Sequence, residues 1–169
     1  QKGNFKKFSD ANNGFASILA LSPEDDQQSI STSGTIRDSN IYGNSSGGAG
    51  YGLIYAYISE SNAVGLISIQ GTSIYNNSDT STGASSPIGT VVSMPITGTD
   101  ATPSGFLDIR NSLFYGNTSA DGYAAIAVGF QSAATQFVGA SISGSTIVGN
   151  TAGVLAQGNY KFDVYNSII

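Results

Sequence analysis

Regularly spaced acidic residues are the first candidates for chemistry in this sequence. Asp108 and Asp163 occupy the same position in two similar segments, and Arg110 follows Asp108 by two residues. Two carboxylates at a defined separation can act as acid and base on a glycosidic bond. The segment between them has Ser141 at that position, so we expect the carboxylates to lie two repeats apart. Asp108 should form a surface ion pair with Arg110, and we expect no catalytic residue here.

Metal and nucleophile chemistry have few candidates. The chain contains no His and no Cys, which removes the commonest general base, the commonest transition-metal ligand and any thiolate. The acidic run Glu24-Asp25-Asp26 offers oxygen ligands for Ca²⁺, but it lacks the spacing of a calcium loop and is more typical of a solvated turn. The sequence therefore predicts no metal site, no cofactor and no enzyme.

Tyrosines provide the candidate binding surface. Tyr42, Tyr75 and Tyr115 share one position in three similar segments, and Val148 takes it in a fourth. Stacked aromatic rings on an exposed sheet can bind sugar rings or another protein. The alternative, which we favour, is that the rings only stabilise neighbouring strands through cross-strand contacts.

These positions belong to a repeat whose consensus is apolar-x-x-Ser/Thr-x-Ile/Phe-Tyr/Val-x-Asn. Its five copies are separated by 33, 40, 33 and 22 positions, and they begin at Ile36, Ile69, Ile109, Ile142 and Val164. A constant motif with variable spacing is typical of a solenoid, in which each copy forms one corner of a coil and the insertions form loops. Strand-like runs between the copies are Phe15–Leu21, Gly52–Ile58, Gly89–Met94, Ala124–Phe130 and Val154–Ala156.

Alternation along a strand assigns a direction to each position of the repeat. The first and sixth positions should form internal apolar columns, and the fourth a column of hydroxyls. The last position should form an internal amide ladder of Asn44, Asn77, Asn117 and Asn150. The sequence therefore predicts an all-β fold: a right-handed, single-stranded parallel β-helix of about five roughly three-sided coils, in one domain over residues 1–169.

Composition limits the classes of partner. Only 10% of the residues are charged, and the net charge of −5 disfavours nucleic acid. The apolar runs are much shorter than the ~20 residues that a membrane-spanning helix needs. We therefore expect no nucleic-acid partner and no membrane span.

The closing residues of the repeat resemble a known family. Phe114-Tyr-Gly-Asn117 resembles the FxxN repeat of chlamydial polymorphic outer-membrane proteins, and three other copies read IxxN. The GGAI element of those proteins has only loose counterparts, at Gly122–Ile126 and Gly47–Gly50. Many secreted bacterial β-helix proteins have similar corners. The resemblance spans residues 34–169 and implies the solenoid fold, which carries adhesins, passenger domains, lyases and hydrolases alike.

Two functions remain open at this point. The favoured one is an extracellular or cell-surface structural or adhesive module, whose partners are other surface proteins, carbohydrate or further copies of itself. The alternative is a non-catalytic portion of a carbohydrate-active β-helix enzyme, a polysaccharide lyase or hydrolase. The last copy stops at Ile168-Ile169, inside its motif. This end favours a segment of a longer solenoid, or else an assembly end at Ile168 and Ile169 for head-to-tail stacking into a filament.

Overall fold

The structure of the chain is a computed structural model, and every structural statement below concerns the residues that it describes. These are residues 4–6, 9–10, 19–21, 31–46, 52–56, 64–80, 89–96, 104–130, 138–157 and 160–169. Within these ranges the chain forms β-strands and turns and no helix. No helix within these ranges is long and apolar enough to cross a bilayer.

The strands pair in parallel into four sheets, which we name A to D in the order in which the chain visits them. Sheet A contains β1 (Asn4–Lys6), β5 (Asn40–Tyr42), β9 (Ser73–Tyr75), β13 (Leu113–Tyr115) and β17 (Thr146–Val148). Sheet B contains the shortest strands, which are β2 (Ser9–Asp10), β6 (Ser45–Ser46), β10 (Ser78–Asp79) and β14 (Thr118–Ser119).

Sheets C and D contain the longer strands. Sheet C contains β3 (Leu19–Leu21), β7 (Ile54–Ala56), β11 (Gly89–Ile96), β15 (Ala124–Phe130) and β18 (Val154–Gln157). Sheet D contains β4 (Ser31–Arg37), β8 (Val64–Gln70), β12 (Ser104–Arg110), β16 (Val138–Ser143) and β19 (Tyr160–Tyr165). The strand-like runs predicted between the repeat copies therefore belong to sheet C.

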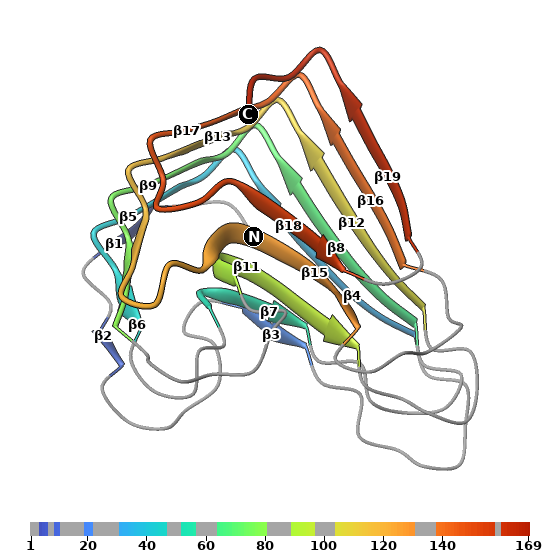
Figure 1. Ribbon diagram of the computed structural model, residues 1–169, viewed down its shortest axis with the longest axis horizontal. Coiled ribbons are helices and arrows are strands. Elements are labelled where there is room, and N and C mark those ends of the chain that lie inside the picture. The colour runs from blue at the N-terminus through green and yellow to red at the C-terminus, as the bar shows by residue number, and fades with distance from the viewer. Residues whose placement is uncertain are drawn as a thin grey trace.

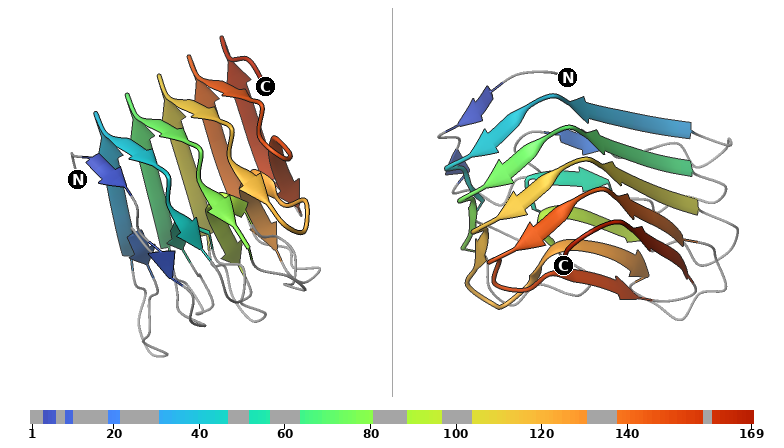
Figure 2. Two further views of the ribbon diagram at one scale, coloured as in Figure 1. Left: turned by 90° about the vertical axis from the view of Figure 1, so that its left-hand side faces the viewer. Right: turned by 90° about the horizontal axis from the view of Figure 1, so that it is seen from above.

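In each of the first four coils the chain passes through sheets A, B, C and D in turn and then begins the next coil (Figure 1). Successive coils lie side by side along the axis, and strands of one sheet point the same way (Figure 2). The path is right-handed, so the predicted parallel β-helix is confirmed. Each of the first four coils has four strands where a roughly three-sided coil was expected, because the bend at the repeat's Asn separates sheet A from sheet B. The fifth coil, with β17, β18 and β19, has no strand in sheet B.

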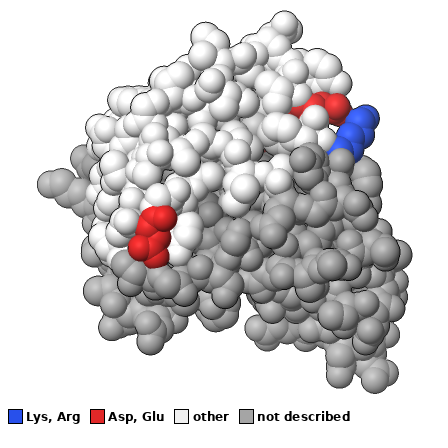
Figure 3. Space-filling model, in the orientation of Figure 1, with Lys and Arg blue, Asp and Glu red and all other residues white. Residues whose placement is uncertain are grey.

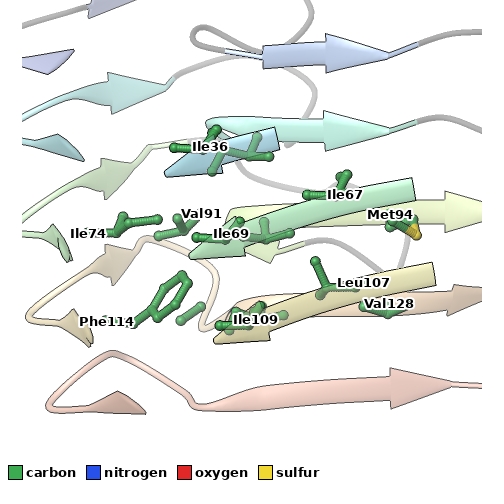
Figure 4. Packing of buried hydrophobic residues seen from close by; sticks show 14 of the residues in the cluster. Ile36, Ile67, Ile69, Ile74, Val91, Met94, Leu107, Ile109, Phe114 and Val128 are labelled. Atoms are coloured by element: carbon green, nitrogen blue, oxygen red, sulfur yellow. The ribbon is translucent and has the colours of Figure 1, made fainter. Parts of the chain in front are cut away.

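The first internal column is confirmed by the register of sheet D. Ile36 pairs with Ile69, Ile69 with Ile109, Ile109 with Ile142, and Ile142 with Val164. The isoleucines in this column are at most 1% exposed. Figure 4 shows Ile36, Ile69 and Ile109 one above another, beside the column of Ile67 and Leu107. Like residues therefore stack on like along the axis.

The second internal column lies on sheet A. Ile41 pairs with Ile74, Ile74 with Phe114, and Phe114 with Ile147, all at most 2% exposed. The bridge between Thr146 and Ile168 extends this register into the fifth copy of the repeat. Sheet C closes the core from the opposite side with buried residues such as Val92, Ile126 and Met94.

An additional coil precedes the first copy of the repeat. Strand β1 pairs with β5 so that Phe5 lies beside Ile41, and β2 pairs with β6 so that Ser9 lies beside Ser45. The consensus does not match this segment, so the sequence pattern missed it. At the other end, Val164, Ile168 and Ile169 are 40%, 64% and 55% exposed, because no described coil covers them.

Candidate functional site

The candidate site is the outer face of sheet A, and two tight bends position its strands. At the third position of the repeat the backbone is left-handed, with φ between +47° and +57° in Asp38, Gly71, Asn111, Gly144 and Asn166. At the eighth position φ lies between +52° and +63° in Gly43, Asn76, Gly116 and Gly149. Gly, Asn and Asp are the residues that adopt this conformation most readily. Both positions were treated as variable in the consensus, although their restriction to these three residue types could have revealed the bends.

A ladder of hydroxyls fixes the bend between sheets D and A. The Ser or Thr at the fourth position donates to the carbonyl two residues before it, as Ser112 Oγ does to Arg110 at 2.8 Å. The same oxygen accepts the backbone N–H of the preceding coil, so Thr72 N lies 3.2 Å from Ser112 Oγ. Ser145 and Ser167 repeat both bonds. The predicted hydroxyl column is therefore a continuous hydrogen-bonded array.

The asparagine ladder fixes the bend between sheets A and B. Asn77 Oδ1 accepts from the backbone N and from Nδ2 of Asn44, at 3.0 and 2.9 Å. Its own Nδ2 donates back to the carbonyl of Ile41 and forward to Asn117 Oδ1, at 3.1 and 2.9 Å. Asn117 repeats this pattern with Ile74 and Asn150. Asn44, Asn77 and Asn117 are 1% exposed and Asn150 is partly exposed, so the predicted ladder is present, its amides are paired and its first three members are buried.

Held between these two bends, Tyr42, Tyr75 and Tyr115 form what we name the tyrosine stripe. Their strands pair in register. The rings of Tyr42 and Tyr75 are stacked with centroids 5.0 Å apart and planes 2° apart, and those of Tyr75 and Tyr115 at 4.9 Å and 4°. Val148 continues the row and is 41% exposed. The sequence therefore identified the residues that the fold aligns.

The stack determines what the stripe can offer to a partner. Both faces of the Tyr75 ring lie against a neighbouring ring, which leaves ring edges and hydroxyl groups toward solvent. Desolvation, followed by the proximity of Tyr115 and Tyr42, raises the pKa of Tyr75 above its usual value of about 10. The hydroxyl is therefore protonated at neutral pH and can both donate and accept a hydrogen bond.

A second group lies on the outer face of sheet D. Arg110 Nε lies 2.9 Å from Asp108 Oδ1 and 2.9 Å from Oδ2, so the expected ion pair is present. It is not fully solvated, because the side chain of Asp108 is only 10% exposed while that of Arg110 is 59% exposed. The hydrogen bond to Asp108, followed by the negative charge of its carboxylate, raises the pKa of Arg110 above its ordinary value. One coil earlier Gln70 bends back in the same way and donates to Ser68 Oγ.

The carboxylates of sheet D do not form an adjacent pair. Asp108 pairs with Ser141 and Ser141 with Asp163, which places the two acids two coils apart as expected. Asp163 Oδ2 instead lies 3.3 Å from Nζ of Lys161 on its own strand. Among the described residues no cluster of three or more acidic groups could hold a metal ion. The run Glu24-Asp25-Asp26 lies outside them.

Burial of Asp79 was not foreseen from the sequence. It lies on β10 in sheet B, is 2% exposed, and pairs in register with Ser46 and Ser119. Side chains two residues apart in a strand point the same way, so the inward direction of Asn77 could have predicted that Asp79 also points inward.

Comparison with known proteins assigns no function to this face. No family model, no curated protein and no solved structure matches the chain. The interpretation of the tyrosine stripe therefore depends on its own geometry.

Proposed function

We propose that this chain is an extracellular or cell-surface structural and adhesive β-helix module. The observation that carries the proposal is the tyrosine stripe, three in-register phenols with ring centroids 5.0 and 4.9 Å apart. A row of identical groups suits a partner that offers several equivalent contacts along its length, such as a carbohydrate polymer or an extended segment of another surface protein. Tyrosine supplies large contact area with few rotatable bonds.

Rigidity supports the adhesive role. The hydroxyl and asparagine ladders fix the backbone on both sides of sheet A, as the bonds of Thr72 and Asn77 illustrate. Side chains that are already ordered lose less conformational entropy when a partner binds. A surface with few charges and many polar groups, together with the resemblance to FxxN repeats, supports a location outside the cell.

Adhesion can be tested with beads that carry the folded chain. The beads would be washed over surfaces coated with cellulose, chitin, collagen or fibronectin, and retention counted under flow. The test variant combines Tyr42→Thr, Tyr75→Thr and Tyr115→Thr, since Thr keeps strand propensity and removes the rings. The control, Tyr165→Thr, removes a tyrosine that is 56% exposed on sheet D.

We expect the original chain and the control to be retained on at least one coating and the triple variant to be released, with unchanged circular dichroism. Equal retention of the triple variant on every coating, or no retention of the original chain, would contradict the adhesive role.

The proposal includes self-association through the last described coil, with a second copy as the partner. Strand β19 pairs with β16 on one side only, and three apolar residues are exposed there: Val164 within the strand and Ile168 and Ile169 after it. The face that contains this coil has few charged groups over its described part (Figure 3). An open strand edge beside apolar side chains favours addition of further parallel strands.

The measurement is light scattering over a range of concentrations, with electron microscopy of the concentrated sample. Ile169→Lys should lower the apparent mass, because a charge would be buried in the contact. Phe106→Lys, at an exposed position of β12 two coils away from β19, should leave the mass unchanged. A chain that is monomeric at every concentration would remove self-association from the proposal and leave adhesion untouched.

A further inference from the structure

The tyrosine stripe holds three phenols in an arrangement that suits a covalent reaction between them. Parallel in-register pairing places equivalent atoms of neighbouring side chains opposite each other, about 4.8 Å apart along the axis. The ring-centroid separations of 5.0 and 4.9 Å, with planes within 4°, agree with this arrangement. Each carbon next to a phenol oxygen therefore faces its counterpart on the next coil.

We propose that the tyrosine stripe is a site of oxidative cross-linking, at which a peroxidase using hydrogen peroxide joins Tyr75 to Tyr42 or to Tyr115. Each of the two phenols gives up one electron and its hydroxyl proton and becomes a phenoxyl radical. The two radicals form a carbon–carbon bond between ring carbons adjacent to the oxygens. This bond leaves each ring as a ketone; each bonded carbon then loses its hydrogen as a proton and each carbonyl oxygen gains one, which restores both phenols.

The electrons and atoms of this step balance. The two rings together lose two hydrogen atoms, as two protons and two electrons. One hydrogen peroxide accepts them and becomes two molecules of water. The chain supplies only the two phenols and their alignment.

Two features of the stripe make the reaction accessible. The three side chains lie on the outer face of sheet A and are partly exposed, so an oxidant can reach their edges and the rings have room to tilt toward each other. Neither internal ladder includes them, so the link would form without breaking the bends that hold the strands.

Tyr75 is required for any link within the stripe because it is the middle ring. Tyr42 and Tyr115 lie on strands β5 and β13, which are separated by β9, so they are about 10 Å apart at the coil spacing. A link at Tyr75 would join positions 33 or 40 residues apart in the chain, which are the separations of the matching asparagines. The bond would therefore fasten neighbouring coils to each other.

The test oxidises the dilute, folded chain with a peroxidase and limiting hydrogen peroxide, followed by trypsin and mass spectrometry. Cleavage after Arg37 and Arg110 gives fragments 38–110 and 111–161. A Tyr75–Tyr115 link joins these two fragments, and a Tyr42–Tyr75 link lies within the first and is located by fragmentation. In both cases the product is lighter than its parts by two hydrogen atoms.

Tyr75→Phe keeps the ring and the stack but cannot form a phenoxyl radical, so the stripe products should fall at least tenfold. Tyr165→Phe should leave their yield unchanged. The chain unfolded in urea serves as the control for the oxidant, and there the links should be spread over many tyrosines. If the oxidant couples tyrosines in the unfolded chain while the folded chain gives no link at Tyr75, the proposal is overturned. An undiminished yield of links between fragments 38–110 and 111–161 from Tyr75→Phe would overturn it as well, because those links would then come from other tyrosines.

Discussion

The side-chain oxygen of Asn76 lies 2.6 Å from the point at which a Cβ on Gly116, in the next coil, would stand. Asn111 and Gly144 have the same relationship at the other bend, at 2.5 Å. An Asn or Asp in one coil thus occupies the space that a larger residue would need in the coil that follows. The left-handed bends therefore restrict which coils can lie next to each other.

Gly116→Ala and Gly43→Ala separate this restriction from backbone strain. Both glycines have φ of +62°, but a Cβ on Gly43 would meet nothing within 4 Å. Each substitution should cost about 1–2 kcal/mol for the left-handed backbone. Gly116→Ala should cost on the order of 1 kcal/mol more, because the Asn76 amide must rotate away. Urea denaturation midpoints measure both.

A double variant, Gly116→Ala with Asn76→Gly, provides the check on that contact. The extra cost of Gly116→Ala should disappear, which gives a favourable coupling energy in the cycle. Equal losses for Gly43→Ala and Gly116→Ala would show that the contact with Asn76 has no energetic effect.

Asn117→Ala tests the asparagine ladder. The change removes the side-chain acceptor of the Asn77 backbone N and Nδ2 and the donor to the Ile74 carbonyl. Asn150 Oδ1 still accepts from the backbone N of residue 117, and Asn77 Nδ2 keeps its bond to the Ile41 carbonyl. Because a buried donor left without its acceptor costs about 1–3 kcal/mol, we expect a loss of that size in the free energy of unfolding. Asn40→Ala, at an exposed position of β5, is the control and should cost far less. Similar losses for both would contradict a structural ladder.

Tyr75 should make stability depend on alkaline pH. Its pKa is raised in the folded chain, so above pH ~10 the unfolded chain loses the phenol proton while the folded chain retains it. The contribution is complete below pH ~10 and is lost as pH rises through the folded pKa. Tyr75→Phe should flatten this part of the stability curve, measured by urea denaturation between neutral and alkaline pH. An unchanged slope in the variant would refute the assignment.

Arg110→Gln should lower the urea midpoint because it leaves the largely buried Asp108 carboxylate uncompensated. Arg37→Gln is the matched control, since Arg37 occupies the same position on β4. The residue two before it is Thr35, where Arg110 has Asp108. In an Asp108→Ser background, which copies Ser68 and Ser141 of the adjacent coils, Arg110→Gln should have little effect. If Arg37→Gln and Arg110→Gln shift the midpoint equally, the ion pair does not stabilise the fold.

Much of this fold follows from the repeat, because coils that stack in register must place equivalent residues together. The apolar columns through Ile69 and Ile74, the ladder through Asn77 and the row through Tyr75 could all be predicted in this way. Each of these columns requires one residue type at a fixed position of the repeat, so the spacing of that residue type in the sequence identifies the column. The alignment of the three tyrosines followed from the same argument.

Other features required information that the consensus does not contain. The first coil contains no recognisable copy of the motif. Its register, with Phe5 beside Ile41, is therefore visible only in the three-dimensional structure. Asp108 is buried although it points outward, because Arg110 lies over it. The number of sheets in a coil depends on the angles of the bends. The left-handed φ of Asn76 and Gly116 determines these angles, and hydrophobic alternation does not reveal them.

The asparagine ladder joins each coil only to the coils immediately before and after it, and this has a mechanical consequence. Every rung from Asn44 to Asn117 donates from Nδ2 to the Oδ1 of the coil that follows. A load that peels away one terminal coil meets only the bonds of that coil with its neighbour, since coils touch only adjacent coils. Stretching such a rod from its two ends would therefore release chain in steps, each as long as one coil with its loop, and the force would rise again before each step.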